Sequence, residues 1–247
     1  MNLRGALGIA LLAASLSASV ASAQMLMVNR FIRQCNDVDH STPPQDAIYA
    51  CTQLIRYNLA IGHALAVLYN SRALHHIDLH QDEEALSDFT RAIFYSPRYA
   101  QAYINRALLQ MVHRRFPDAV ADYGQVISII PNNQIGYSAR CWARALWGQE
   151  LDLARADCET ALRLSPHRLG ALEGVGLINL REARYADAYA AYDEAVAANA
   201  GNARVRYGRG IAARRLGRAA DASADFAAAT EIDPQVPQTF AGYGITP

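Results

Sequence analysis

The side chains with the most reactive chemistry in this sequence are cysteines and histidines. His76 and His80 lie four positions apart, a spacing that lets two imidazoles on one helix face bind a metal, but no third ligand is evident beside them. A metal site is therefore not expected. The four cysteines include no Cys-x-x-Cys pair, the spacing typical of dithiol redox sites: Cys35, Cys51, Cys141 and Cys158.

Other routes to catalysis are equally unsupported. The sequence contains no lysine, so a Schiff base and a phosphate-loop lysine are both excluded. It has no nucleophile elbow and no glycine-rich phosphate loop, and no two carboxylates are forced together. The formal net charge is zero, which gives no global field for nucleic acid or anionic lipid. We expect a protein that is not an enzyme, binds no nucleic acid and needs no cofactor.

The first 23 residues have the pattern of a secretory signal peptide. One arginine precedes a short apolar run from Ala6 to Val20, and Ala21-Ser22-Ala23 is a small-x-small cleavage signal. The run is short for a bilayer span, so cleavage before Gln24 is favoured over an uncleaved anchor. This predicts a periplasmic or secreted protein with no membrane insertion after cleavage.

The elements that position these side chains come from an internal repeat. Tyr69 and Tyr103 lie 34 positions apart, and each is followed by the same pattern of small, aromatic and proline residues. One extra residue after Gly148 lengthens a single unit. One position of the repeat is alanine in every unit: Ala85, Ala119, Ala154, Ala188 and Ala222. A regular period of this length predicts stacked supersecondary units.

The spacing within each unit predicts two antiparallel helices. Apolar residues recur at helical intervals, small ones where two backbones must approach and large ones beside them. A single helix pair cannot bury its apolar face alone, so neighbouring pairs must stack. The predicted organisation is a signal peptide at 1–23, a degenerate capping repeat at 24–65, repeats at 66–99, 100–133, 134–168, 169–202 and 203–236, and a tail or short cap at 237–247.

The repeat resembles the tetratricopeptide family, whose pattern is W-x2-L-G-x2-Y…A-x3-F…P, over residues 66 to 236. The resemblance implies an all-α fold, a right-handed α-solenoid of about six antiparallel helix pairs. The stretches around Cys35, Cys51, Cys141 and Cys158 are also similar to exported alphaproteobacterial repeat proteins. The carboxylate clamp of chaperone-binding members is not matched, because Leu74 replaces an asparagine and Ile135 and Ala139 replace the basic pair.

The cysteines fall on facing positions of two helix pairs. In an antiparallel pair these positions oppose each other, and an oxidising compartment favours a bond. This predicts disulfides Cys35–Cys51 and Cys141–Cys158. The alternative is four free buried thiols that act as small hydrophobes.

In proteins of the resembled family the first helix of each pair lines a concave groove. The predicted groove residues are Asn70, Leu74, Ile77, Ile104, Leu108, Met111, Ser138, Trp142, Leu177, Arg204, Tyr207, Ile211, Arg214 and Arg215. The middle of this set is apolar, as interaction surfaces commonly are. The alternative is that neighbouring repeats or the chain's own tail cover part of it.

The last repeat is rich in arginine. Six arginines and no acidic residue lie between positions 204 and 218, which suggests that this end of the groove accepts an acidic segment. The alternative is a terminal repeat kept soluble by charge. The predicted function is a scaffold that binds a protein or extended peptide. Two alternatives are a thiol- or metal-dependent periplasmic enzyme or sensor, and a structural module of an envelope complex bound by its convex edge.

Overall fold

The computed structural model describes residues 24–37 and 41–247, and every regular element in this part of the chain is a helix. A helix over residues 24–35 comes first. The others are α2 (Pro44–Arg56), α3 (Gly62–Asp78), α4 (Asp82–Tyr95), α5 (Ala100–Val112), α6 (Phe116–Ile129), α7 (Gln134–Trp147), α8 (Leu151–Leu164), α9 (Leu169–Arg181), α10 (Tyr185–Ala198), α11 (Ala203–Arg215), α12 (Ala219–Ile232) and α13 (Val236–Gly242).

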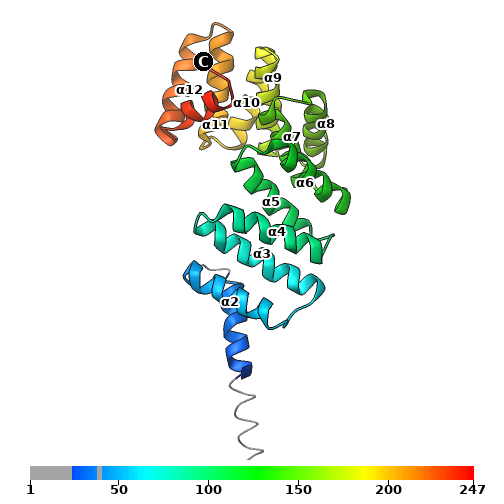
Figure 1. Cartoon of the computed structure of the whole chain (residues 1–247). Helices are drawn as coiled ribbons and strands as arrows, with labels where there is room; N and C mark the ends of the chain where they lie inside the picture. The colour runs from blue at the N-terminus through cyan, green and yellow to red at the C-terminus, as the bar shows by residue number, and fades with distance from the viewer. Residues whose placement is uncertain (1–23, 38–40) are drawn as a thin grey trace, which may run out of the picture. The chain divides into compact units, whose positions relative to one another are not determined.

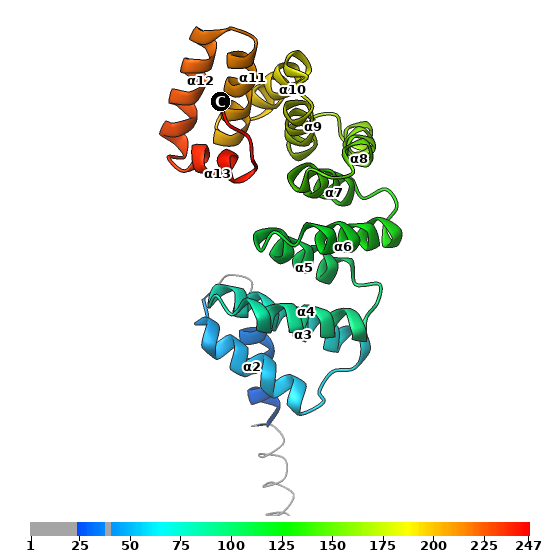
Figure 2. The same ribbon diagram turned by 45° about the horizontal axis from the view of Figure 1, so that its top comes forward.

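The chain divides into two compact units, Met1–Ala102 and Tyr103–Pro247. In the first unit, α3 packs against both α2 and α4. In the second unit, the pairs α7–α8, α9–α10 and α11–α12 follow one another, and α7, α9 and α11 also contact in sequence as first helices (Figures 1 and 2). These sequential antiparallel pairs confirm the predicted all-α, repeat-type fold.

Short polar and proline signals delimit the helices. The side chain of Asn133 accepts a hydrogen bond from the backbone N–H of Gly136 at 2.8 Å, and Asn202 caps α11 in the same way. Proline occupies the first turn of α6 and of α13, where a missing N–H costs nothing. These local rules give each pair its tight turn and its antiparallel geometry.

The repeated alanine is buried in every unit. Each copy lies in the first turn of the second helix of its pair, where a small side chain leaves room for the first helix to approach. Their exposed fractions are 2% or less: Ala85, Ala119, Ala154, Ala188 and Ala222. The packing rule inferred from the sequence is therefore confirmed.

The predicted signal peptide at 1–23 lies outside the described residues. Among the helices over the described residues, none combines the length and the apolar character needed to cross a membrane.

Candidate functional site

The C-terminal end of the second unit folds back over its own first helices. Helix α13 follows α12 and packs against α11 and α12, with Val236 and Phe240 buried. The ring of Phe240 lies 5.1 Å from that of Tyr207 on α11. Tyr243–Pro247, here called the tail, then runs beyond α13, and Gly244 adopts a left-handed conformation (φ 73°) that redirects the chain.

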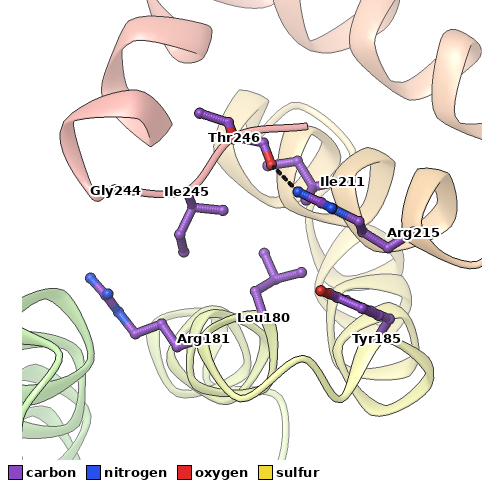
Figure 3. Close-up of a pocket in the computed structure, with 8 residues that line it drawn as sticks. All are labelled: Leu180, Arg181, Tyr185, Ile211, Arg215, Gly244, Ile245 and Thr246. Atoms are coloured by element: carbon purple, nitrogen blue, oxygen red, sulfur yellow. Dashed lines mark hydrogen bonds between the residues drawn. The ribbon is translucent and has the colours of Figure 1, made fainter.

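Three arginines donate hydrogen bonds to main-chain carbonyls at this end of the chain. Arg114 reaches the oxygen of Gly242 at 2.6 Å, and Arg181 reaches that of Tyr243 at 3.0 Å. Arg215 reaches the oxygen of Thr246 at 3.3 Å (Figure 3). The first two oxygens end α13, where helix carbonyls lack internal partners and carry partial negative charge. These hydrogen bonds are made to main-chain atoms and do not depend on which side chains the segment carries.

Arg181 also holds the end of α7. Its Nε donates to the carbonyl of Ala145 at 2.7 Å, and its Nη2 donates to that of Leu146 at 3.0 Å. Burial lowers the pKa of the Arg181 guanidinium, although arginine stays charged at neutral pH. A single cation thus links the last turn of α7, its own helix α9 and the tail.

Two tail side chains face the helices. The Tyr243 ring lies edge-on to Trp142 of α7 with centroids 6.0 Å apart, and 5.5 Å from the ring of Phe240. Ile245 points toward Leu180 and Arg181 of α9 (Figure 3). A pocket of about 240 Å³ remains there, lined by Leu180, Arg181, Tyr185, Ile211, Arg215 and residues 244–246. The tail therefore uses an aromatic and an aliphatic side chain two positions apart.

A second hollow, of about 160 Å³, lies beside Trp142. Its lining includes Arg204 and Glu173, whose carboxylate is buried and accepts from Arg204 Nε at 2.6 Å. This hydrogen bond raises the pKa of Arg204, and the guanidinium lies 5.7 Å from the Trp142 ring centre. Since α7, α9 and α11 all contribute, this hollow extends the same face as the tail site.

Tyr192 lies in the interior of this part of the unit. A Cβ added to Gly176 or Gly208 would come within 2.6 Å or 2.4 Å of its ring, so the ring occupies a notch between two glycines. Its hydroxyl is buried with no hydrogen-bond partner in the described part of the chain. Burial raises the pKa of Tyr192, and Glu173 and Tyr243 add to the effect.

The predicted groove residues of the second unit fall into two groups. Leu108 is 54% exposed, Ile104, Met111 and Trp142 are half-buried, and Arg204, Arg214 and Arg215 are exposed. The others are buried: Ser138, Leu177, Tyr207 and Ile211. The expectation of an open apolar groove is corrected here: α13 covers Tyr207, and Ile245 packs into the cluster that holds Ile211. At the α11 end of the predicted groove, the alternative that the chain's own tail covers part of it fits the structure.

In the first unit, Asn70 is buried, Leu74 is exposed and Ile77 is half-buried. Leu74 and Ile77 line a hollow of about 600 Å³ together with Cys35 and His75. His75 is itself buried, with its Nε2 3.1 Å from the carbonyl oxygen of Cys35. These residues form a separate feature of the first unit.

The cysteines form the two predicted disulfides, Cys35–Cys51 and Cys141–Cys158, and all four are completely buried. Gly174 of α9 packs directly on the second bond, since a Cβ there would lie 2.5 Å from the sulfur of Cys141. The described residues contain no group of three or more His, Cys, Asp or Glu placed to hold a metal.

The arginines of the last repeat are mostly paired. Arg204 binds Glu173, Arg209 binds Asp225, and Arg218 binds Asp221. Arg206 donates to the carbonyl of Ala200, and Arg215 to the tail. Arg214 is exposed and has no ion pair among the described residues. Five of the six positive charges suggested for an acidic segment thus have partners within the chain.

Sequence reasoning missed a repeated ion pair. Arginine and aspartate bind each other through two hydrogen bonds between the first and second helices of four pairs. The nitrogen to oxygen distances are 2.7 or 2.8 Å in all of them: Arg72–Asp88, Arg106–Asp122, Arg140–Asp157 and Arg209–Asp225. In α9–α10 the equivalent residues are Val175 and Ala191. In each repeat the arginine and the aspartate are either both present or both absent, and this pattern could have been seen in the sequence. Arg114, which binds the last carbonyl of α13, was also missed as a binding residue.

Comparison with known proteins identifies the repeat. A family model described as a tetratricopeptide repeat matches residues 70–133 and 180–237. The DnaJ homolog subfamily C member 7 homolog of Dictyostelium discoideum is 32% identical over 101 residues, which are 41% of this chain and 19% of that protein. The chain thus matches only about a fifth of the length of this curated relative.

Solved structures share the architecture. A tetratricopeptide repeat protein from Parabacteroides merdae superposes with a TM-score of 0.72 at 16% identity, over 88% of each chain. YrrB, described as a tetratricopeptide repeat protein with an unusual peptide-binding site, gives a TM-score of 0.56 at 18% identity, over 81% of this chain and all of that one. At these identities the likeness shows the fold alone.

Proposed function

Since the chain is a tetratricopeptide repeat protein, and hence a protein–protein interaction module, we propose that it is an exported, non-enzymatic scaffold whose second unit binds a peptide segment of another protein. The binding site is the face formed by α7, α9 and α11, together with the exposed Leu108 of the preceding first helix α5. The observation that carries the proposal is the tail itself: a peptide segment lies on this face, held by contacts from Arg181 and Arg215 to its carbonyls. YrrB is described as having a peptide-binding site within the same fold.

Export is part of the proposal. It is supported by the N-terminal pattern at 1–23 and by the two disulfides, which persist in oxidising compartments such as the periplasm. The test is cell fractionation, followed by intact mass after alkylation without reductant. Four alkylated cysteines in protein isolated from its native compartment would contradict export to an oxidising space.

An acidic feature in the ligand is a narrower version of the proposal. It is supported by Arg214, which is exposed and without an ion pair in the described part of the chain. The test is Arg214→Glu. Weaker ligand binding at low salt supports an acidic ligand segment, and unchanged binding contradicts this narrower proposal. The enzyme, sensor and convex-edge alternatives have no comparable observation in their favour.

The binding proposal is tested by selecting peptides from a displayed random library on the wild-type protein. The selected peptides are then measured against Leu108→Arg and Trp142→Ser, which alter the face, and against Leu153→Ser, which alters an exposed leucine of α8. We expect the first two to weaken binding at least about tenfold, a cost typical of interface hot spots. Peptides that bind all four proteins equally would place binding elsewhere.

A further inference from the structure

Helix α13 and the tail are buried to different extents. Val236 and Phe240 of α13 are fully buried and anchor the helix in the unit's core. In the tail, by contrast, Gly244 and Thr246 are exposed, and Tyr243 and Ile245 are only half-buried. Segments with few buried apolar contacts open at lower free energy than the core. The tail can therefore leave the face while α13 stays in place.

Besides backbone hydrogen bonds to α13, such as that from Ile245 N–H to the carbonyl oxygen of Phe240 at 3.1 Å, the tail is held by contacts that do not depend on its being part of this chain. Arg181 and Arg215 donate to its main-chain oxygens, which any peptide possesses. Arg181 is positioned by α7 carbonyls as well as by its own helix, so it stays in place when the tail leaves. Arg181 is thus a preorganised donor, and preorganisation reduces the entropic cost of binding.

The side-chain contacts specify a pattern. Tyr243 lies against Trp142, and Ile245 faces Leu180 in the pocket shared with Ile211 (Figure 3). The pocket around Ile245 is not filled, because about 240 Å³ remains beside it. A longer aliphatic side chain at this point of a ligand would fill more of that space and gain contacts.

Resting on the proposed function, we infer that the tail is an internal occupant of the peptide site, and that the external ligand is a protein segment with an aromatic residue followed two positions later by an aliphatic one. The ligand competes with the tail for Trp142, for the pocket beside Ile245, and for Arg181 and Arg215. Residues 243–247 thereby set a threshold of affinity that a partner must exceed.

The experiment releases the tail without removing α13. In the full chain, Tyr243→Ser and Ile245→Ser are combined, and the probe is a fluorescein-labelled peptide with the sequence of residues 239–247, followed by anisotropy. We expect the released variant to bind this peptide at least tenfold more tightly than the wild-type protein does. A probe with serine at both of the same positions is expected to bind neither protein.

Two controls separate the site from general exposure of apolar surface. Adding Arg181→Ala to the released variant should abolish the gain, because it removes the central carbonyl donor. Leu153→Ser in the wild-type protein should leave peptide binding unchanged. Should the double variant fail to fold, as judged by circular dichroism, deletion of Ile245–Pro247 replaces it.

Four outcomes decide the inference. Tighter binding by the released variant, specific for the aromatic and aliphatic pair, supports it. Equal binding of the two probes, or no gain on release, overturns it. If peptides selected from a random library bind the face equally well with and without the tail, the inference fails while the proposed function stands. If no peptide binds either protein, both fail.

Discussion

Helix pair α9–α10 is built differently from its neighbours α7–α8 and α11–α12. The neighbours each join their two helices with an arginine–aspartate pair, Arg140–Asp157 and Arg209–Asp225, whose aspartates are buried. In α9–α10 the same positions hold Val175 and Ala191. Charged and apolar solutions both close this contact, but a mixed one would leave a charge buried without its partner.

At the next positions α9–α10 differs from α7–α8, whereas α11–α12 has the same arrangement, with Gly210 against the ring of Phe226. Where α7–α8 has the Cys141–Cys158 disulfide, α9–α10 has Gly176 facing the ring of Tyr192. Helix α9 is also the more enclosed element, with nine of its thirteen residues buried against five of fourteen in α7. The pair that holds the tail through Arg181 is thus held together by packing instead of by an ion pair or a covalent bond. The comparison teaches that equivalent repeats can be stabilised by different means while preserving one backbone.

The largest expected effect on stability comes from replacing only one partner of an arginine–aspartate pair by the apolar residue found in α9–α10. Arg106→Val leaves the buried carboxylate of Asp122 without its two hydrogen bonds, and we expect the free energy of unfolding to fall by about 3 kcal/mol. Arg106→Val with Asp122→Ala reproduces the α9–α10 arrangement and should cost less than about 1 kcal/mol. Urea unfolding of the two single variants and the double variant measures the coupling. Additive losses would contradict the comparison.

The Cys141–Cys158 disulfide should contribute nearly as much. Its two cysteines are 17 positions apart, and closing a loop of this size stabilises the folded state by about 3 kcal/mol in the chain-entropy description. We expect the Cys141→Ala and Cys158→Ala double variant to lose between about 2 and 4 kcal/mol. Reductant should destabilise the wild-type protein but not a variant that lacks all four cysteines. Equal urea midpoints with and without reductant in the wild type would refute the contribution of both bonds.

A glycine exchange tests the notch that holds Tyr192. In Gly208→Ala the new Cβ would lie 2.4 Å from the ring, and we expect a loss of about 2 kcal/mol from overpacking. The matched control is Gly124→Ala within α6, where the nearest atom is Arg140 Nη1 at 3.5 Å. There the same substitution should stabilise by about 0.5–1 kcal/mol, because glycine is unfavourable inside a helix. Thermal unfolding of both variants should give shifts of opposite sign.

The repeat, the helix pairs and both disulfides could be predicted from the sequence because each depends on contacts that recur with the period. Ala85 and its equivalents specify close helix approach wherever they occur, and Cys141 and Cys158 occupy facing positions. The arginine–aspartate pairs follow the same period and could have been found by comparing the two helices of each unit.

The site itself depends on contacts that do not recur. Arg114 and Gly242 are 128 positions apart in the sequence, and no periodic pattern joins them. The return of the tail depends on one left-handed glycine, Gly244, and on two half-buried side chains. Exposure of Tyr207 and Ile211 could not be judged from the repeat alone, since α13 and the tail, which pack against them, lie outside it.

The smallest expected effect concerns the unpaired hydroxyl of Tyr192. Tyr192→Phe removes a buried group that has no partner in the described part of the chain, so the variant should be as stable as the wild type at pH 7 or more stable by up to about 1 kcal/mol. Burial raises the pKa of Tyr192 in the folded state above its usual value of about 10. Below pH 10 both the folded and the unfolded state keep the Tyr192 proton. Above pH 10 the unfolded state loses this proton first, so Tyr192 lowers the stability as pH rises.

The advantage of Tyr192→Phe should therefore grow between about pH 10 and 11 in urea unfolding. Tyr57→Phe, at an exposed tyrosine, is the matched control and should show no such growth. A Tyr192→Phe variant clearly less stable than the wild type at pH 7 would mean that the hydroxyl has a partner, and the notch between Gly176 and Gly208 would then be a polar site.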